Sequence, residues 1–164
     1  MTVLWAERAL LPGGWAESVR VEINADGRIG QVRAGADPEG QRVGLLLPAM
    51  ANLHSHAFQR AMAGLSESRG PHPRDTFWTW RQIMFRFLDH LTPDDVEAIA
   101  ALVQMEMLEA GFATNMEFHY LHHRPGGAPY ANLAEMSDRI AAAAARTSSA
   151  PRARSWRWPR PSPA

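Results

Sequence analysis

Two strand-like runs, each leading into a segment that contains histidines, constrain the fold of this chain more than any other feature. Residues 44–50 (GLLLPAM) are continuously apolar and lead into residues 52–56 (NLHSH). Residues 112–118 (FATNMEF) form a second strand-like run, which leads into residues 119–123 (HYLHH). A continuous apolar run is typical of a strand buried on both faces. Polar residues at its end indicate that the strand opens on a site.

Helical patterns separate and follow the two runs. Residues 76–91 carry aromatic and aliphatic residues at spacings of three and four, which predicts a helix. Thr92 and Pro93 supply the N-cap and first residue of a second helix, which we expect to end at Gly111. A last helix is expected from about residue 133 to residue 146. The order strand, helices, strand, helix predicts an α/β protein with a parallel sheet or barrel.

The two ends of the chain differ from this pattern. Residues 1–45 alternate short strand-like segments with turns, which predicts a small β meander. Residues 146–164 contain only Arg, Pro, Ser, Ala, Thr and Trp and have no periodicity, so they cannot build a core. We interpret residues 147–164 as a disordered tail or an out-of-frame translation of GC-rich DNA. The alternative is a basic, aromatic tail that binds nucleic acid.

Composition limits the partners and the chemistry of any site. The formal net charge is +0, which gives no global reason to expect nucleic acid or an anionic membrane as a partner. No signal peptide and no run of 18 apolar residues is visible, which predicts a cytoplasmic protein. The chain has no cysteine, and all 17 of its basic residues are arginine. A metal ion would therefore have to be held by His, Asp or Glu.

His54 and His56 are the leading candidates for metal ligands. Residues two apart in an extended segment point to the same side, so both imidazoles can reach one point. The alternative is a pair of ordinary surface histidines. Position favours metal binding, because sites of parallel α/β enzymes lie at the carboxyl ends of the strands.

The surrounding segments resemble a known family. Residues 47–56 (LPAMANLHSH) resemble the first barrel strand of the amidohydrolase superfamily, with Ala49 where those enzymes usually have glycine. Three further segments resemble formimidoylglutamate deiminases: 56–64 (HAFQRAMAG), 76–81 (TFWTWR) and 117–123 (EFHYLHH). The resemblance runs in order from about residue 3 to residue 145.

The resemblance implies zinc-dependent hydrolysis of N-formimino-L-glutamate to N-formyl-L-glutamate and ammonia, a step of histidine degradation. One zinc ion per complete site would lower the pKa of a water molecule. His54 and His56 would be its first two ligands, and Gln59 and Tyr120 would contact the substrate. Without the resemblance, Gln59 would be read as solvent-facing and Tyr120 as a packed rim aromatic.

Other polar residues near the second run receive weaker interpretations. Three histidines, His119, His122 and His123, are interpreted as rim or loop residues, because consecutive histidines cannot all face one metal ion. Glu117 lies within the run and is left without a role. The catalytic acid and base, and the remaining metal ligands, are expected beyond the end of this chain.

A (β/α)8 barrel takes about 250 residues, so we expect an incomplete TIM-like barrel here. The expected segments are a small-domain β segment at 1–45, the beginning of the barrel at 46–146 and the tail at 147–164. We expect such a chain to be inactive alone, with a small-molecule substrate and a homodimer as an option for the full-length form. The alternatives are another amidohydrolase, such as a guanine- or cytosine-type deaminase, and a non-enzymatic product.

Overall fold

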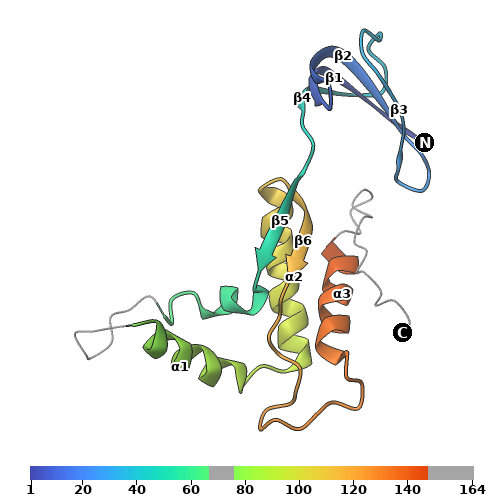
Figure 1. The fold of residues 1–164 in the computed structure, drawn as a ribbon. Coiled ribbons are helices and arrows are strands. Elements are labelled where there is room, and N and C mark those ends of the chain that lie inside the picture. The colour runs from blue at the N-terminus through green and yellow to red at the C-terminus, as the bar shows by residue number, and fades with distance from the viewer. Residues whose placement is uncertain (67–75, 148–164) are drawn as a thin grey trace. The chain divides into compact units, whose positions relative to one another are not determined.

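The computed structural model describes residues 1–66 and 76–147 (Figure 1). These residues divide into two compact units, with the division between Met50 and Ala51. Each unit has its own cluster of buried apolar side chains. The units are therefore described separately.

The first unit is a four-stranded sheet in the order β3-β2-β1-β4. Its strands are β1 (Thr2–Leu11), β2 (Gly14–Ile23), β3 (Ile29–Arg33) and β4 (Gln41–Leu46). The first three pair antiparallel in chain order, which confirms the predicted meander, whereas β4 returns to lie parallel to β1. The core of this unit consists of Ala6, Ala9, Val19 and Val21.

The apolar run 44–50 was expected to form one strand buried on both faces, and this prediction is wrong. The run is split, because β4 ends at Leu46 and β5 (Met50–Ser55) begins four residues later. Pro48 lies between them, and proline has no N–H group to donate to a ladder. The side chains are also not buried, since Leu47 is 52% exposed and Met50 is 51% exposed. His54 therefore lies within a strand rather than after it.

The second unit is built on two strands joined by helices. β5 pairs with β6 (Phe112–Glu117), and the arrows of the two strands point the same way in Figure 1. The connection passes through the short 3-10 helix η1 (Ala57–Met62) and the helices α1 (Phe77–Leu88) and α2 (Pro93–Glu109). This strand–helix–strand order confirms the predicted α/β architecture.

Helix α2 begins and ends where its sequence predicts. The Thr92 hydroxyl accepts a hydrogen bond from the Asp95 backbone N–H at 3.2 Å, and the Asp95 carboxylate accepts one from the Thr92 N–H at 2.9 Å. This capping box satisfies two backbone groups near the helix start. At the other end, Gly111 has a φ of +88°, which favours glycine.

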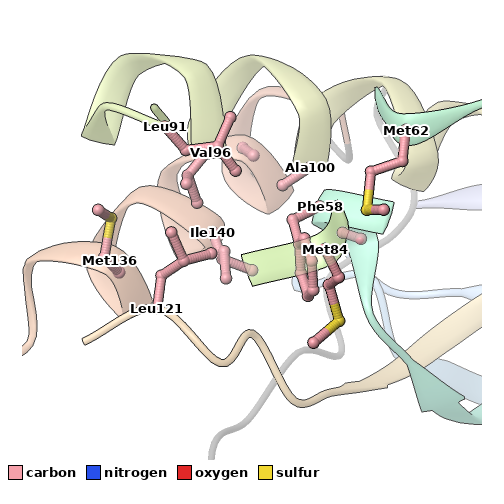
Figure 2. Packing of buried hydrophobic residues seen from close by; sticks show 11 residues of the cluster. Phe58, Met62, Met84, Leu91, Val96, Ala100, Leu121, Met136 and Ile140 are labelled. Atoms are coloured by element: carbon pink, nitrogen blue, oxygen red, sulfur yellow. The ribbon is translucent and has the colours of Figure 1, made fainter. Parts of the chain in front are cut away.

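The core of the second unit lies between α2, α3 (Glu135–Thr147) and η1 (Figure 2). Helix α2 contributes a stripe of Val96, Ala100 and Gln104, spaced by four residues along one face. Arg139 of α3 reinforces the packing, because its guanidinium lies 3.2 Å from a Glu97 carboxylate oxygen of α2. The other buried apolar residues are Ala57, Phe58, Met62, Met84, Leu91, Leu121, Met136, Ile140 and Ala143.

The expected tail was residues 147–164, and all of it beyond Thr147 lies outside the described residues. Within the described ranges, none of the helices combines the length and the apolar character that crossing a membrane requires.

Candidate metal centre

The rings of His54 and His56 meet at the carboxyl end of β5. Their Nε2 atoms lie 2.9 Å apart, and the ring planes are nearly perpendicular, at 80°. His54 is exposed and His56 is half-buried. The structure thus brings the two predicted ligands to one point, as alternation along a strand requires.

The hydrogen bond made by Nδ1 of His56 determines whether Nε2 of the same ring carries a hydrogen. Nδ1 of His56 lies 2.8 Å from the carbonyl oxygen of Phe118, which follows β6. A carbonyl oxygen can only accept, so Nδ1 carries the hydrogen. In the neutral imidazole, Nε2 of His56 then presents a lone pair toward His54. A ligand histidine is commonly oriented by such a bond from its other ring nitrogen.

This arrangement fits two ligands of a divalent metal ion. Zinc binds imidazole nitrogen at about 2.0–2.1 Å, and a tetrahedral angle then puts two such nitrogens about 3.3 Å apart. The observed Nε2 separation of 2.9 Å is close to that value, and His54 is exposed. Within residues 1–66 and 76–147, no group of three or more His, Cys, Asp or Glu side chains gathers around one point. The described part of the chain therefore offers a pair of ligands.

Asn52 supports the strand that carries this pair. Its side-chain oxygen accepts a hydrogen bond from the His54 backbone N–H at 3.2 Å, and its amide nitrogen lies 3.3 Å from the sulfur of Met107. Asn52, His54 and His56 are spaced two residues apart, so their side chains lie on the same side of the chain. Asn52 thus anchors that side to helix α2.

Tyr120 lies beside His56. Its ring centroid is 5.0 Å from that of His56 and 4.7 Å from that of Phe118, both in edge-on orientations. Its backbone φ is +60°, a strained value for a residue with a large side chain. The residue is 41% exposed, so it can offer its hydroxyl to a molecule bound at the histidine pair.

Gln59 lies in η1, three residues beyond His56. Its backbone N–H donates to the His56 carbonyl oxygen at 3.0 Å, which holds η1 against the end of β5. Its side-chain nitrogen lies 3.9 Å from the sulfur of Met84 in α1. The side chain is half-buried against that helix, and its predicted role at the substrate stays a prediction.

His119, the first histidine after β6, lies against α3. Nε2 of His119 lies 2.9 Å from the Ser137 hydroxyl, and the His122 ring lies edge-on to that of His119 at 4.6 Å. Burial, followed by the charge of His122, lowers the pKa of His119. A cavity of about 310 Å³ adjoins this cluster and is lined by Glu117, His119 and residues of α3.

Glu117, which sequence reasoning left without a role, is the buried carboxylate of this region. It is 7% exposed, and one carboxylate oxygen accepts a hydrogen bond from the Ala57 backbone N–H at 2.7 Å. The second oxygen lies 3.4 Å from the side-chain nitrogen of Asn115. In the sequence, the signal for this residue was one acidic side chain at the end of an otherwise uncharged strand.

Comparison with known proteins shows which family contains this site. The amidohydrolase family model matches residues 45–151, which include both histidines and both strands of the second unit. The chain belongs to the amidohydrolase family. The preceding residues, 1–42, match the N-terminal domain of formimidoylglutamate deiminase HutF.

Individual relatives place this amidohydrolase chain more closely. It is 53% identical over 146 residues to a formimidoylglutamate deiminase of Pseudomonas aeruginosa, covering 88% of this chain and 32% of that protein. The crystal structure of an amidohydrolase from Brucella melitensis superposes with a TM-score of 0.82 and 52% identity, over 89% of this chain and 33% of that one. The chain therefore spans about a third of the length of these relatives.

A more distant structure shows the fold alone. A zinc-bound adenosine deaminase from Xanthomonas campestris matches with a TM-score of 0.60 and 18% identity, over 88% of this chain and 31% of that one. Like the Brucella structure, it matches the described strands and helices with about a third of a larger fold.

Proposed function

We propose that this chain forms the N-terminal part of an enzyme that hydrolyses N-formimino-L-glutamate to N-formyl-L-glutamate and ammonia in histidine degradation. The observation that carries the proposal is the convergence of the two Nε2 atoms of His54 and His56 at 2.9 Å. The 53% identity to the Pseudomonas deiminase supports the choice of this substrate over those of other amidohydrolases.

In this proposal His54 and His56 are two ligands of a divalent metal ion, and zinc fits the imidazole donors. Such an ion lowers the pKa of water and so supplies a nucleophile at neutral pH. The Phe118 carbonyl oxygen, 2.8 Å from Nδ1, holds the His56 ring in place and keeps its Nε2 free of hydrogen. Both ligands lie in or next to β5, so in this proposal the strand holds them in position without the metal ion.

Tyr120 and Gln59 are the proposed substrate contacts. The Tyr120 ring packs at 5.0 Å from His56, so its hydroxyl can bond a polar group of a molecule bound beside the metal. Gln59 lies one helical turn beyond His56, and its side-chain nitrogen makes a long contact to the sulfur of Met84, at 3.9 Å. A weak sulfur acceptor is readily exchanged for a substrate oxygen.

The remaining ligands, the acid and base groups and any homodimer contact belong, in this proposal, to the part of the fold that the relatives have in addition. A closed tetrahedral site needs more than two protein ligands. We propose that the complete enzyme acts on its small-molecule substrate in the cytoplasm.

A chimeric enzyme tests the proposal. Residues 1–146 of this chain would be joined to the C-terminal two thirds of the Pseudomonas deiminase and loaded with zinc. We expect ammonia release from N-formimino-L-glutamate and none from guanine or cytosine. A folded chimera that acts on guanine or cytosine instead would favour the other amidohydrolase classes.

A further inference from the structure

We propose that Glu117 is a positioning residue of the metal centre, which keeps His56 in the tautomer whose Nε2 can bind a metal ion. The inference rests on the proposed function only in taking His56 as a ligand. It concerns the junction between the end of β5, the start of η1 and the end of β6.

The ladder between β5 and β6 stops one bond early at this junction. The Phe118 N–H donates to the Ser55 carbonyl oxygen at 2.9 Å, as in a parallel ladder. In such a ladder, a residue that donates to one residue of the neighbouring strand accepts from the residue two positions further on. The regular partner of the Phe118 carbonyl oxygen would therefore be the N–H of Ala57.

Two side chains replace that bond. The Ala57 N–H donates instead to the Glu117 carboxylate at 2.7 Å. The Phe118 carbonyl oxygen accepts from Nδ1 of His56 at 2.8 Å. The carboxylate thus substitutes for a backbone carbonyl, and that carbonyl becomes the group that orients the histidine.

A purely structural role does not require this carboxylate. The regular backbone bond would satisfy both Ala57 and Phe118 without any side chain. A carboxylate that is only 7% exposed carries a desolvation cost that its hydrogen bonds must offset. The exchange adds one interaction that the regular ladder lacks, the bond to His56.

Loss of the carboxylate oxygen should therefore act on His56 through the backbone. The Ala57 N–H would be left to compete for the Phe118 carbonyl oxygen. His56 would then distribute its hydrogen between Nδ1 and Nε2. An Nε2 that carries hydrogen cannot bind a metal ion, so affinity would fall.

Two variants separate this mechanism from a simple charge effect. Glu117→Gln removes the charge but keeps an oxygen at the same reach, which can still accept from Ala57. Glu117→Asp keeps the charge but shortens the side chain by one methylene group. Long-range 1H–15N NMR spectra of the 164-residue chain, without zinc and at a pH where imidazole is neutral, report the tautomer of His56. Titration with zinc ions in the same spectra reports affinity.

We expect Glu117→Gln to retain the Nδ1–H tautomer and an affinity near that of the unaltered chain. Glu117→Asp should give a mixture of tautomers and about tenfold weaker zinc binding, the lower end for changes behind a ligand. The reverse order, with Asp retained and Gln lost, would show a charge effect and overturn the proposal. Should Glu117→Asp fail to fold, a folded Glu117→Gln chain without the Nδ1–H tautomer would overturn it as well.

His54→Ala keeps the two proposals apart. If it leaves zinc affinity unchanged, the assignment of the histidine pair as ligands fails. The effect of Glu117 on the tautomer of His56 is measured without zinc, so that effect would stand or fall separately. If zinc binding needs His54 but the tautomer is the same in all three Glu117 forms, only the inference about Glu117 fails.

Discussion

His56 and Phe118 are joined by a bond from an imidazole nitrogen to a backbone carbonyl oxygen, 2.8 Å long, across 62 positions of sequence. This bond links the candidate ligand after β5 to the end of β6. The orientation of the ligand therefore depends on the pairing of the two strands. Any change that separates β5 from β6 should disturb the metal centre as well as the fold.

His119 should make stability depend on pH. Its pKa is lowered in the folded chain by burial and by His122, against a smaller opposing effect of Glu117. Below the ordinary histidine pKa of about 6.5, the unfolded state then binds more protons than the folded state. The free energy of unfolding should therefore fall as the pH is lowered through that value.

Urea denaturation at about pH 7.5 and at about pH 5.5, on either side of the ordinary histidine pKa, measures this effect. His119→Asn should lower the pH dependence, since asparagine can bond Ser137 but does not titrate. His90→Asn, at an exposed position, is the matched control and should leave the dependence intact. If the free energy of unfolding changed equally with pH in all three proteins, the assignment of the pH dependence to His119 would be wrong.

Thr92→Ala should lower the free energy of unfolding by about 1 kcal/mol, the usual cost of losing an N-cap side chain. The change removes the acceptor of the Asp95 N–H and the hydroxyl that bonds the Asp95 carboxylate at 2.6 Å. Thermal or urea denaturation measures the loss. Thr92→Ser keeps the hydroxyl and should cost much less. Equal losses in the two variants would mean that the methyl group, not the cap, matters.

Ile140→Ala should be the more damaging change, with a loss of about 2–5 kcal/mol. Ile140 is 4% exposed and belongs to the buried cluster of the second unit that is shown in Figure 2. Removing its side chain leaves a cavity in the core of the second unit. Leu133→Ala, at a position 78% exposed, serves as the control and should change stability little. Similar losses at the two positions would show that the core lies elsewhere.

The 164-residue chain alone should not release ammonia from N-formimino-L-glutamate. Its described residues gather two candidate ligands at one point, His54 and His56, and a catalytic zinc site uses about three protein ligands. A coupled assay for ammonia with added zinc checks this. Release well above a protein-free blank would mean that the chain completes a site by itself.

Sequence alone predicted the elements whose signals are local. Thr92 and Pro93 predict the start of α2 and Gly111 predicts its end, and the observed helix follows the prediction. The pairing of His54 with His56 was also predictable, because alternation along a strand brings residues two apart to one side.

The errors and omissions come from features that local patterns do not encode. Apolar residues run without interruption from Gly44 to Met50, and periodicity cannot show that they serve two different strands. The bond from Ala57 to Glu117 joins residues 60 positions apart. The strained φ of Tyr120 depends on the chain leaving β6, which no rule of residue type predicts for a tyrosine.

The most direct test measures zinc content and turnover of the chimera described above with His54→Ala, His56→Ala or Gln59→Ala. Each histidine change removes a ligand, so zinc content should fall and ammonia release should stop. Gln59→Ala should keep the zinc and lower kcat/KM, because only a substrate contact is lost. Full zinc content and near-normal kcat in the His54→Ala chimera would contradict the metal centre and, with it, the proposed function.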